Sequence, residues 1–320
     1  MSRYARQICL PGVGAAGQAR LAAARVLVVG AGGLGSALLP LLAGAGVGAI
    51  RIVDPDVVEE SNLHRQTLYA MADLGRPKAE VAAERLAALN PGCTARPRVA
   101  RLDPALAGEE IRTADLVVDA ADSVAVTYAL SDLCLAADLP LISASVVGTS
   151  GYVGGFCGGA PSYRAVFPDL PGRVQSCASA GVMGPVVAAL GALQAQMALA
   201  VLLGHVPSPL GQMLTLDAGA WRPAGFRFDG APEPEVAGPK VVALCDLTER
   251  DRVIDLRGPD EAPHLPVPWA ERMALEEVGR SVVAAKGRTV LVCASGLRAW
   301  RAAQGLLREG ARDVVIAAAG

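Results

Sequence analysis

Short runs of β-branched residues alternate, over the first two thirds of the chain, with longer segments whose apolar positions recur at helical spacing. The runs predict buried strands at 25–30, 49–54, 114–119, 139–143 and 151–157. The segments predict helices at 17–24, 36–45 and 78–89. A strand, a turn, a helix and a second strand make a βαβ unit, which requires a parallel sheet covered by helices. The last strand, short and rich in glycine, fits an antiparallel position.

The segment 182–204 carries no charge over about the length of a membrane span. Gln194 and Gln196 lie in its middle, and Pro185 and Gly191 interrupt it. These polar and helix-disturbing positions favour a buried helix against the sheet. We therefore expect no membrane association.

The periodic pattern stops at residue 221 in a cluster of Pro, Gly and charged residues and restarts near 240. The later pattern predicts strands and helices at 253–256, 270–285, 289–292, 297–308 and 314–316. A chain of 320 residues is long enough for two domains. We expect an α/β protein: a Rossmann-like, doubly wound and mostly parallel sheet in 1–222, a linker in 223–239, and a small α/β domain in 240–320.

Composition narrows the classes of function. The formal charge of -2 gives no field for nucleic acid or an anionic membrane surface. Seven scattered cysteines form no CxxC pair, which fits a reducing compartment and offers no zinc-ligand spacing. The N-terminus lacks the apolar core of a secretory signal, so we expect a cytoplasmic protein.

A glycine-rich turn follows the first strand. Residues 30–35 read GAGGLG and fit G-x-G-x-x-G, and Asp54 ends the next strand about 20 residues on. Glycines let the backbone approach a phosphate, the helix N-terminus supplies N–H groups, and the carboxylate can accept ribose hydroxyls. The pattern predicts a nucleotide site, although a turn that merely connects strand and helix is the alternative. It does not separate NAD from ATP.

Basic residues beyond the second strand favour ATP. Arg65 lies in 62–66, and Lys78 ends the segment 75–78. A triphosphate attacked at its α-phosphorus needs cations to hold the departing pyrophosphate, whereas a dinucleotide dehydrogenase does not. Either residue alone is more typical of a solvated surface charge, so the inference depends on the set.

Several motifs together resemble the MoeB/ThiF family of adenylyltransferases, bacterial relatives of ubiquitin-activating enzymes. They occur in order over about residues 1–220: RYARQ at 3–7, GAGGLG at 30–35, DPD at 54–56, SNLHRQ at 61–66, GRPKAE at 75–80, NP at 90–91 and SAGVMGP at 179–185. The resemblance implies a homodimer whose subunits bind Mg-ATP. Each would activate the C-terminal glycine of a small ubiquitin-like sulfur carrier ending in Gly-Gly.

The resemblance also assigns residues. The implied nucleotide-binding set is Gly30, Gly32, Gly33, Gly35, Asp54, Asp56, Asn62, Arg65, Gln66, Lys78 and Asp122. Within this set Asp54 would hold the ribose, and Asn62, Arg65 and Lys78 would contact the triphosphate. Arg6 would reach into the neighbouring subunit's site. Asp122 would help place magnesium and nucleotide, the alternative being an ordinary carboxylate at a strand end.

The chain departs from the family at two places and matches some of its members at a third. Residue 123 is Ser where the family has Asn, which puts a nucleotide contact in doubt. The segment 161–165 lacks the first of two CxxC pairs that many members carry, so we expect no structural zinc, and something else must order this region. Cys177 matches a position where some relatives have a cysteine that bonds the carrier, the alternative being a bystander thiol.

The second domain resembles a short rhodanese. Cys293 to Arg298 reads CASGLR, between a predicted strand and a predicted helix, and matches the C-x-x-G-x-R loop. Asp255-Leu-Arg257 resembles the D-x-R strand of that family, and His264-Leu-Pro its H-[IL]-P segment. A thiol so placed faces a helix N-terminus and backbone N–H groups that stabilise an anionic sulfur. Cys293 is therefore predicted to carry a persulfide, the alternative being a silent domain in which it only packs.

Together these features give one hypothesis and two alternatives. The first domain would adenylate the carrier, and Cys293, loaded by a donor such as a cysteine desulfurase, would supply sulfur to form a thiocarboxylate. An NAD-dependent oxidoreductase would explain the glycine turn and Asp54, but not Arg6, Arg65 or Lys78. A non-catalytic module that docks a ubiquitin-like protein would bind the carrier without releasing pyrophosphate.

Overall fold

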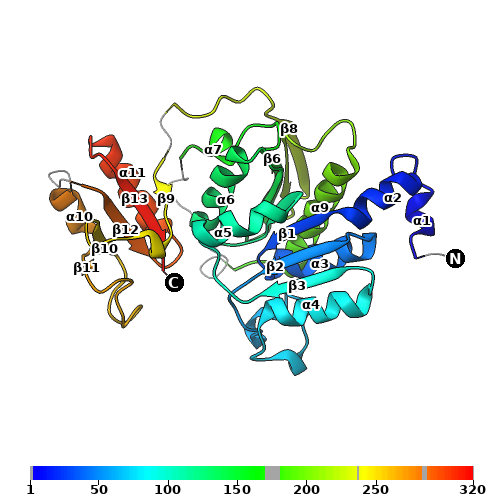
Figure 1. The fold of residues 1–320 in the computed structure, drawn as a ribbon, viewed down its shortest axis with the longest axis horizontal. Coiled ribbons are helices and arrows are strands. Elements are labelled where there is room, and N and C mark those ends of the chain that lie inside the picture. The colour runs from blue at the N-terminus through cyan, green and yellow to red at the C-terminus, as the bar shows by residue number, and fades with distance from the viewer. Residues whose placement is uncertain (1–2, 170–180, 236–237, 283–286, 320) are drawn as a thin grey trace.

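The computed structural model describes residues 3–169, 181–235, 238–282 and 287–319. Among these residues, eight strands form one sheet in the order β3-β2-β1-β4-β5-β6-β7-β8 (Figure 1). The strands are β1 (Arg25–Val29), β2 (Ala49–Val53), β3 (Thr94–Arg98), β4 (Leu116–Asp119), β5 (Leu141–Val147), β6 (Ser150–Phe156), β7 (Gln212–Asp217) and β8 (Arg222–Arg227). Strands β3 to β5 in this order pair in parallel, and β6, β7 and β8 continue the sheet antiparallel.

This arrangement confirms the predicted doubly wound, mostly parallel sheet, including an antiparallel β6. Strands β3, β7 and β8 were not predicted from the sequence. All six residues of β8 are exposed, so the strand lacks the alternation that marks a half-buried one, and it lies largely within the segment 223–239 expected to be a linker. Backbone pairing with β7, rather than burial, defines it.

Helices cover both faces of the sheet. On one face lie α3 (Gly33–Ala45), α4 (Lys78–Leu89) and α9 (Gly184–Leu203), and on the other α5 (Pro104–Glu110) and α6 (Val124–Ala136). Alternate residues of β1 enter the two cores: Val26 and Val28 on the first face, Leu27 and Val29 on the second. Shorter elements are α1 (Ala5–Ile8), α2 (Gly14–Ala23), η1 (Glu60–Asn62), η2 (Met71–Asp73), η3 (Ile111–Thr113) and α7 (Tyr163–Val166).

Helix α9 is long and apolar enough to cross a membrane by length and composition. In this structure it packs against α3, β5 and β6, which confirms the prediction of a buried helix on the sheet. Gln194 explains the polar residue at its centre. The Gln194 Nε2 donates to the backbone oxygens of Asp119 at 2.6 Å and Ile142 at 3.2 Å, so it ties the helix to β4 and β5 and supplies a donor for these carbonyl groups.

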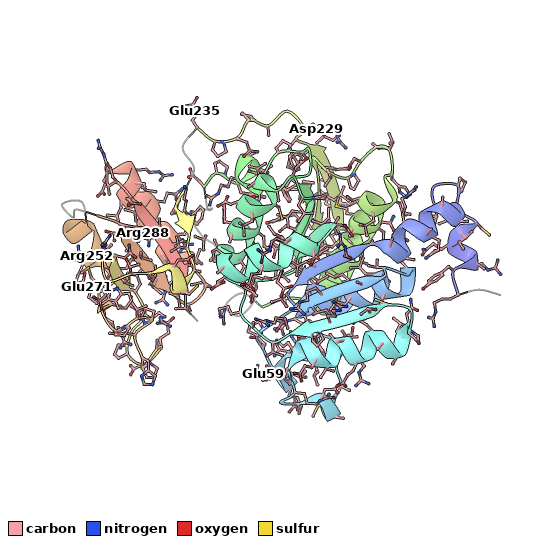
Figure 2. The ribbon with its side chains drawn as sticks, in the orientation of Figure 1. Glu59, Asp229, Glu235, Arg252, Glu271 and Arg288 are labelled. Atoms are coloured by element: carbon pink, nitrogen blue, oxygen red, sulfur yellow. The ribbon has the colours of Figure 1, made fainter. Side chains whose placement is uncertain are left out.

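The second sheet follows the linker and has the order β11-β10-β12-β13-β9, all parallel. Its elements are β9 (Lys240–Val241), η4 (Leu244–Asp246), β10 (Arg252–Asp255), β11 (Glu271–Arg272), α10 (Leu275–Val282), β12 (Thr289–Cys293), α11 (Leu297–Arg308) and β13 (Val314–Ala318). Residues 271–272, expected to open a helix, form β11 instead. The Arg252 Nε donates to Glu271 Oε1 at 2.6 Å, and both side chains are marked in Figure 2.

One hydrophobic cluster runs from the α6 face of the first sheet into the core of the second. At its centre the rings of Tyr128 and Trp300 lie 4.0 Å apart between centroids. The Arg164 guanidinium lies 4.9 Å from the first ring and 5.1 Å from the second, and its Nε donates to Asp132 at 2.5 Å. The second domain therefore completes its core against α6 of the first.

Hydrogen bonds to a carboxylate order the segment 161–165, where the sequence offers no zinc ligands. The Glu233 side chain accepts from Ser162 N at 2.7 Å and from Ser162 Oγ at 2.6 Å. The same serine caps α7, since its Oγ accepts from Ala165 N. Within the described part of the chain, no cluster of three or more His, Cys, Asp or Glu side chains could hold a metal ion.

A fully buried carboxylate closes β4. Asp119 accepts from Thr127 Oγ1 at 2.8 Å, Ser143 Oγ at 2.9 Å and Ala121 N at 3.2 Å. Burial raises the pKa of Asp119 to about 6 despite these hydrogen bonds. These contacts fix the turn that leads from β4 into α6.

Replacing Asp119 by Asn is expected to change how stability depends on pH. The raised pKa means that the folded state holds the Asp119 proton more tightly than the unfolded state. The resulting contribution to folding stability is complete below pH 3.8 and is lost as pH rises through about 6. Over that window the wild type should lose about 3 kcal/mol relative to D119N, at about 1.4 kcal/mol per pKa unit. Urea unfolding, monitored by circular dichroism at several pH values, measures the free energy of unfolding of both proteins. Parallel pH curves for the two proteins would contradict the assignment, and the exposed Asp260→Asn serves as control.

Candidate active site

A cavity of about 380 Å³ opens at the carboxyl ends of β1, β2 and β4. This edge is where ligands bind in open α/β sheets. Among the predicted residues, those that line the cavity are Gly30, Gly32, Gly33, Asp54, Asp56, Asn62, Arg65, Gln66, Lys78 and Asp122. Gly35 lies behind them in the first turn of α3.

The glycine turn brings the start of α3 against the cavity. Gly30 has a φ of +99°, and a Cβ there would lie 2.5 Å from the Ala120 backbone oxygen at the end of β4. A side chain is excluded both by this conformation and by the neighbouring strand. Helix α3 begins at Gly33, so its first N–H groups face the cavity and favour an anion there.

Asp54 anchors the same turn. It is 5% exposed; its Oδ2 accepts from Ala31 N at 2.7 Å and its Oδ1 from Asp56 N at 2.8 Å. Burial raises the pKa of Asp54, and these backbone hydrogen bonds and the nearby Lys78 oppose the rise. The carboxylate therefore shapes the glycine turn in addition to presenting an acceptor beside it, a role that the motif alone did not reveal.

Lys78 is a buried cation at the start of α4. Its side chain is 5% exposed, and its Nζ lies 2.9 Å from Asp56 Oδ2. The Lys78 backbone N–H also donates to the backbone oxygen of Asp56 at 2.9 Å. The Asp56 side chain is largely exposed, and it is the one carboxylate that the structure places in an ion pair with Lys78 among the described residues. A buried ammonium needs such a partner, and a phosphate can take the same place.

Arg65, Asn62 and Gln66 form a connected group on the segment after η1. The Arg65 guanidinium donates to Asn62 Oδ1 at 2.8 Å, and Asn62 Nδ2 donates to Glu59 Oε2 at 3.0 Å; Figure 2 marks Glu59 at this corner of the molecule. Gln66 lines the cavity with a buried Oε1 that has no hydrogen-bond partner among the described residues. A buried acceptor without a donor fits a ligand that supplies one.

The cavity lining also includes apolar side chains and one cation, Arg101, that was not predicted from the sequence. Leu102 and Val126 are buried there, which suits a flat base, while Arg101 is exposed at the rim. Arg101 follows β3, a strand that was not predicted, so its place at the carboxyl edge of the sheet could not be inferred. The signal was present in the basic run of residues 96–101.

The remaining predicted positions lie in different parts of the molecule. Arg6 is exposed on α1, at the end of the molecule opposite the second sheet (Figure 1). Cys177 lies outside the described residues. Asp122 is exposed at the cavity rim, and Ser123 beside it is buried.

Cys293 ends β12, the central strand of the second sheet. Its side chain is 1% exposed, and its Sγ accepts from Ala299 N in the first turn of α11 at 3.4 Å. Asp255 and Arg257 end the neighbouring strand β10 as a buried ion pair, with Nε 2.9 Å from Oδ1. The predicted thiol, helix N-terminus and D-x-R pair are thus brought together at one edge of this sheet.

Curated proteins and solved structures similar to this chain include the following. The adenylyltransferase and sulfurtransferase UBA4 of Yarrowia lipolytica is 45% identical over 205 residues, 63% of this chain and 52% of that protein. The sulfur carrier protein adenylyltransferase of Thermus thermophilus is 45% identical over 226 residues, 68% of this chain and 83% of that protein. The chain thus spans about half the length of the UBA4 relative.

The solved structure of MccB from E. coli with MccA-N7isoASN superimposes with a TM-score of 0.65 at 24% identity, over 74% of this chain and 75% of that one. This likeness concerns the fold. The profile of the ThiF family matches residues 4–231, which include the first sheet and its cavity. The predicted MoeB/ThiF resemblance is confirmed: this chain belongs to the ThiF family.

Proposed function

We propose that this chain uses ATP to adenylate the C-terminal glycine of a small ubiquitin-like sulfur carrier. The observation that carries the proposal is that the buried cation Lys78 and the cation Arg65 line one cavity together with the glycine turn at the carboxyl edge of the sheet. The names of the Yarrowia and Thermus relatives, an adenylyltransferase and sulfurtransferase and a sulfur carrier protein adenylyltransferase, support it. A nicotinamide reaction would give these two cations no role.

The chemistry asks for charge neutralisation rather than proton transfer. A carboxylate is ionised at neutral pH and needs no base to attack the α-phosphorus. One oxygen–phosphorus bond forms to the carrier carboxylate, and the bond to the β-phosphate breaks. Arg65 and Lys78 would hold the charge that develops on pyrophosphate, together with the N–H groups at the start of α3. Asp54 would hold the ribose.

Magnesium fits the donor set at the cavity rim. Asp122 offers an exposed carboxylate there, and carboxylate and phosphate oxygens are the ligands that Mg²⁺ prefers. The ion would supply further charge neutralisation at the phosphates. Asp122 would then orient it from the turn that Asp119 fixes.

We propose that sulfur transfer follows on Cys293. The terminal sulfur of its persulfide, supplied by a donor such as a cysteine desulfurase, would bond the glycine carbonyl carbon as AMP leaves. Attack of a second thiol on the Cys293 sulfur would then release the carrier thiocarboxylate and leave a disulfide. The position of Cys293 at the N-terminus of α11 supports this role.

We also propose a homodimer formed through α9. This helix presents small and apolar side chains to solvent along one stripe: Pro185, Ala188, Ala189, Ala192 and Leu193. Small residues let two helices approach closely, and an apolar stripe on a helix needs cover. The family resemblance places Arg6 in the partner's site, which fits its exposure far from the cavity of its own chain.

Replacing Lys78 or Arg65 by Ala is expected to lower carrier-dependent ATP–pyrophosphate exchange by about 100-fold or more, because the leaving pyrophosphate loses its counter-charge. The half-buried Arg76, in the same segment as Lys78 but bonded to Glu84 and outside the cavity lining, is the matched control, and R76A should retain exchange. Ubiquitin-like proteins ending in Gly-Gly serve as carriers. Saturable NADH binding without exchange for any carrier would instead favour the oxidoreductase.

Replacing Cys293 by Ala should abolish thiocarboxylate formation while leaving pyrophosphate exchange unchanged, because adenylation takes place in the other domain. Mass spectrometry of the carrier, with ATP and a sulfur donor present, detects the exchange of one oxygen for sulfur. The exposed Cys245 of the same domain gives the control C245A, which should behave as the wild type. Full thiocarboxylate yield from C293A would remove the persulfide from the mechanism.

Placing a charge on the exposed stripe of α9, with Ala192→Arg, is expected to give monomers, because a buried unpaired guanidinium opposes association. Light scattering of the eluting protein measures the mass. If Arg6 acts across the dimer, A192R should lose pyrophosphate exchange as well. Leu265→Arg, on an exposed loop of the second domain, is the control. A monomeric wild type would refute the dimer.

A further inference from the structure

The first turn of α6 lies between the two sites. Ser123, which lines the nucleotide cavity, donates its Oγ hydrogen to the Ser295 backbone oxygen at 3.2 Å. Ala125 N donates to the same oxygen at 3.4 Å. Ser295 belongs to the loop that follows Cys293, so one carbonyl of the sulfur-transfer loop caps the helix that borders the cavity.

Shape reinforces these hydrogen bonds. Gly296 has a φ of +84°, and a Cβ there would lie 2.5 Å from Ala125 Cβ. The glycine of the C-x-x-G-x-R pattern is therefore in close contact with the first domain. Ala125 is 2% exposed, so the loop and the helix turn exclude water between them.

With the loop in contact with α6, the Cys293 thiol is not accessible to solvent. Cys293 is 1% exposed and lies two residues before Ser295. A sulfur donor or a carrier cannot reach a buried sulfur atom, whereas sulfur transfer needs contact with both. The loop has to leave α6 before Cys293 can react.

Other contacts between the domains lie farther along α6 and at α7. Tyr128 packs against the Trp300 ring, and the Arg164 guanidinium lies over the same ring. Opening the loop therefore requires the segment 294–296 to move, while the aromatic contact keeps the two domains together. Local opening of this kind costs far less than global unfolding.

We propose that Ser123 and Ala125 form a latch that holds the Cys293 loop closed, and that the thiol reacts when the latch opens. Ser123 acts as a positioning residue, since it touches the loop and not the sulfur. The contact also gives a role to the serine that stands where the family has Asn. The inference rests on the proposed function only for the use made of the thiol.

The reactivity of Cys293 toward iodoacetamide, mapped peptide by peptide in the intact chain, tests the latch. In the wild type Cys293 should react far more slowly than the exposed Cys245. Ser123→Ala should speed Cys293 alkylation about fivefold, the population change that one neutral hydrogen bond supports. Ala125→Leu, which crowds Gly296 without altering the loop, should speed it roughly tenfold or more. Ser123→Thr keeps the hydroxyl and should react as the wild type.

Buried Cys93 and Cys134 in the first domain report general loosening. Their alkylation should stay unchanged in every variant, and a parallel rise at these thiols would overturn the latch in favour of lost stability. Cys293 that reacts as fast as Cys245 in the wild type, or unchanged rates in both S123A and A125L, would overturn it as well. The reaction needs neither ATP nor carrier, so the latch can fail while adenylation stands, and the reverse.

Discussion

Helix α6 has to be covered on both sides. Its sequence is apolar around most of its circumference, and a helix of that kind is stable only when it is buried. The first sheet covers one side, and α11 of the second domain covers the other through the contact of Tyr128 with Trp300. The small second sheet in turn has a limited core of its own on its far face, so each domain supplies apolar surface that the other lacks. The relative position of the nucleotide cavity and the Cys293 loop follows from this shared burial.

The protein's own side chains organise the cavity. Asp54 fixes the glycine turn, Asp56 holds Lys78, and Asn62 holds Arg65. Each cation already has a fixed direction, so little reorganisation is needed when charge develops on a leaving group. The carboxylate and amide partners also stabilise the cations without a ligand, which allows a positive site to persist in a folded protein. A site with two fixed cations, Lys78 and Arg65, suits a reaction that needs charge neutralisation more than proton transfer.

The sequence patterns predicted those elements that are determined by interactions between residues close together in the chain. The β-branched runs, the glycine turn and the strand-end Asp54 are short-range signals, and the βαβ unit that they indicate places Arg65 and Lys78 near the same edge. Strand β8 was missed because all its residues are exposed and only backbone pairing with β7 defines it, which leaves no periodicity in the segment itself. Arg101 was missed because it follows β3, whose position depends on pairing with the distant strand β2. The contact between Ser123 and Ser295, 172 residues apart, is of the same kind. The sequence placed a cysteine before a helix, but only tertiary packing determines that this loop meets α6.

Enclosure of Cys293 has a chemical reason. Reactive thiols and persulfides are oxidised in proportion to their exposure, and each exposed interval risks an unproductive reaction. A loop that closes against α6 limits exposure without a separate lid. The aromatic contact with Trp300 keeps the second domain in place when the loop moves. The Cys293 sulfur therefore stays near the cavity where an adenylate would form. A tether converts the encounter of thiol and adenylate into an intramolecular event at high effective concentration, so brief opening is sufficient. Protection of the Cys293 thiol and delivery of its sulfur therefore both depend on the first turn of α6.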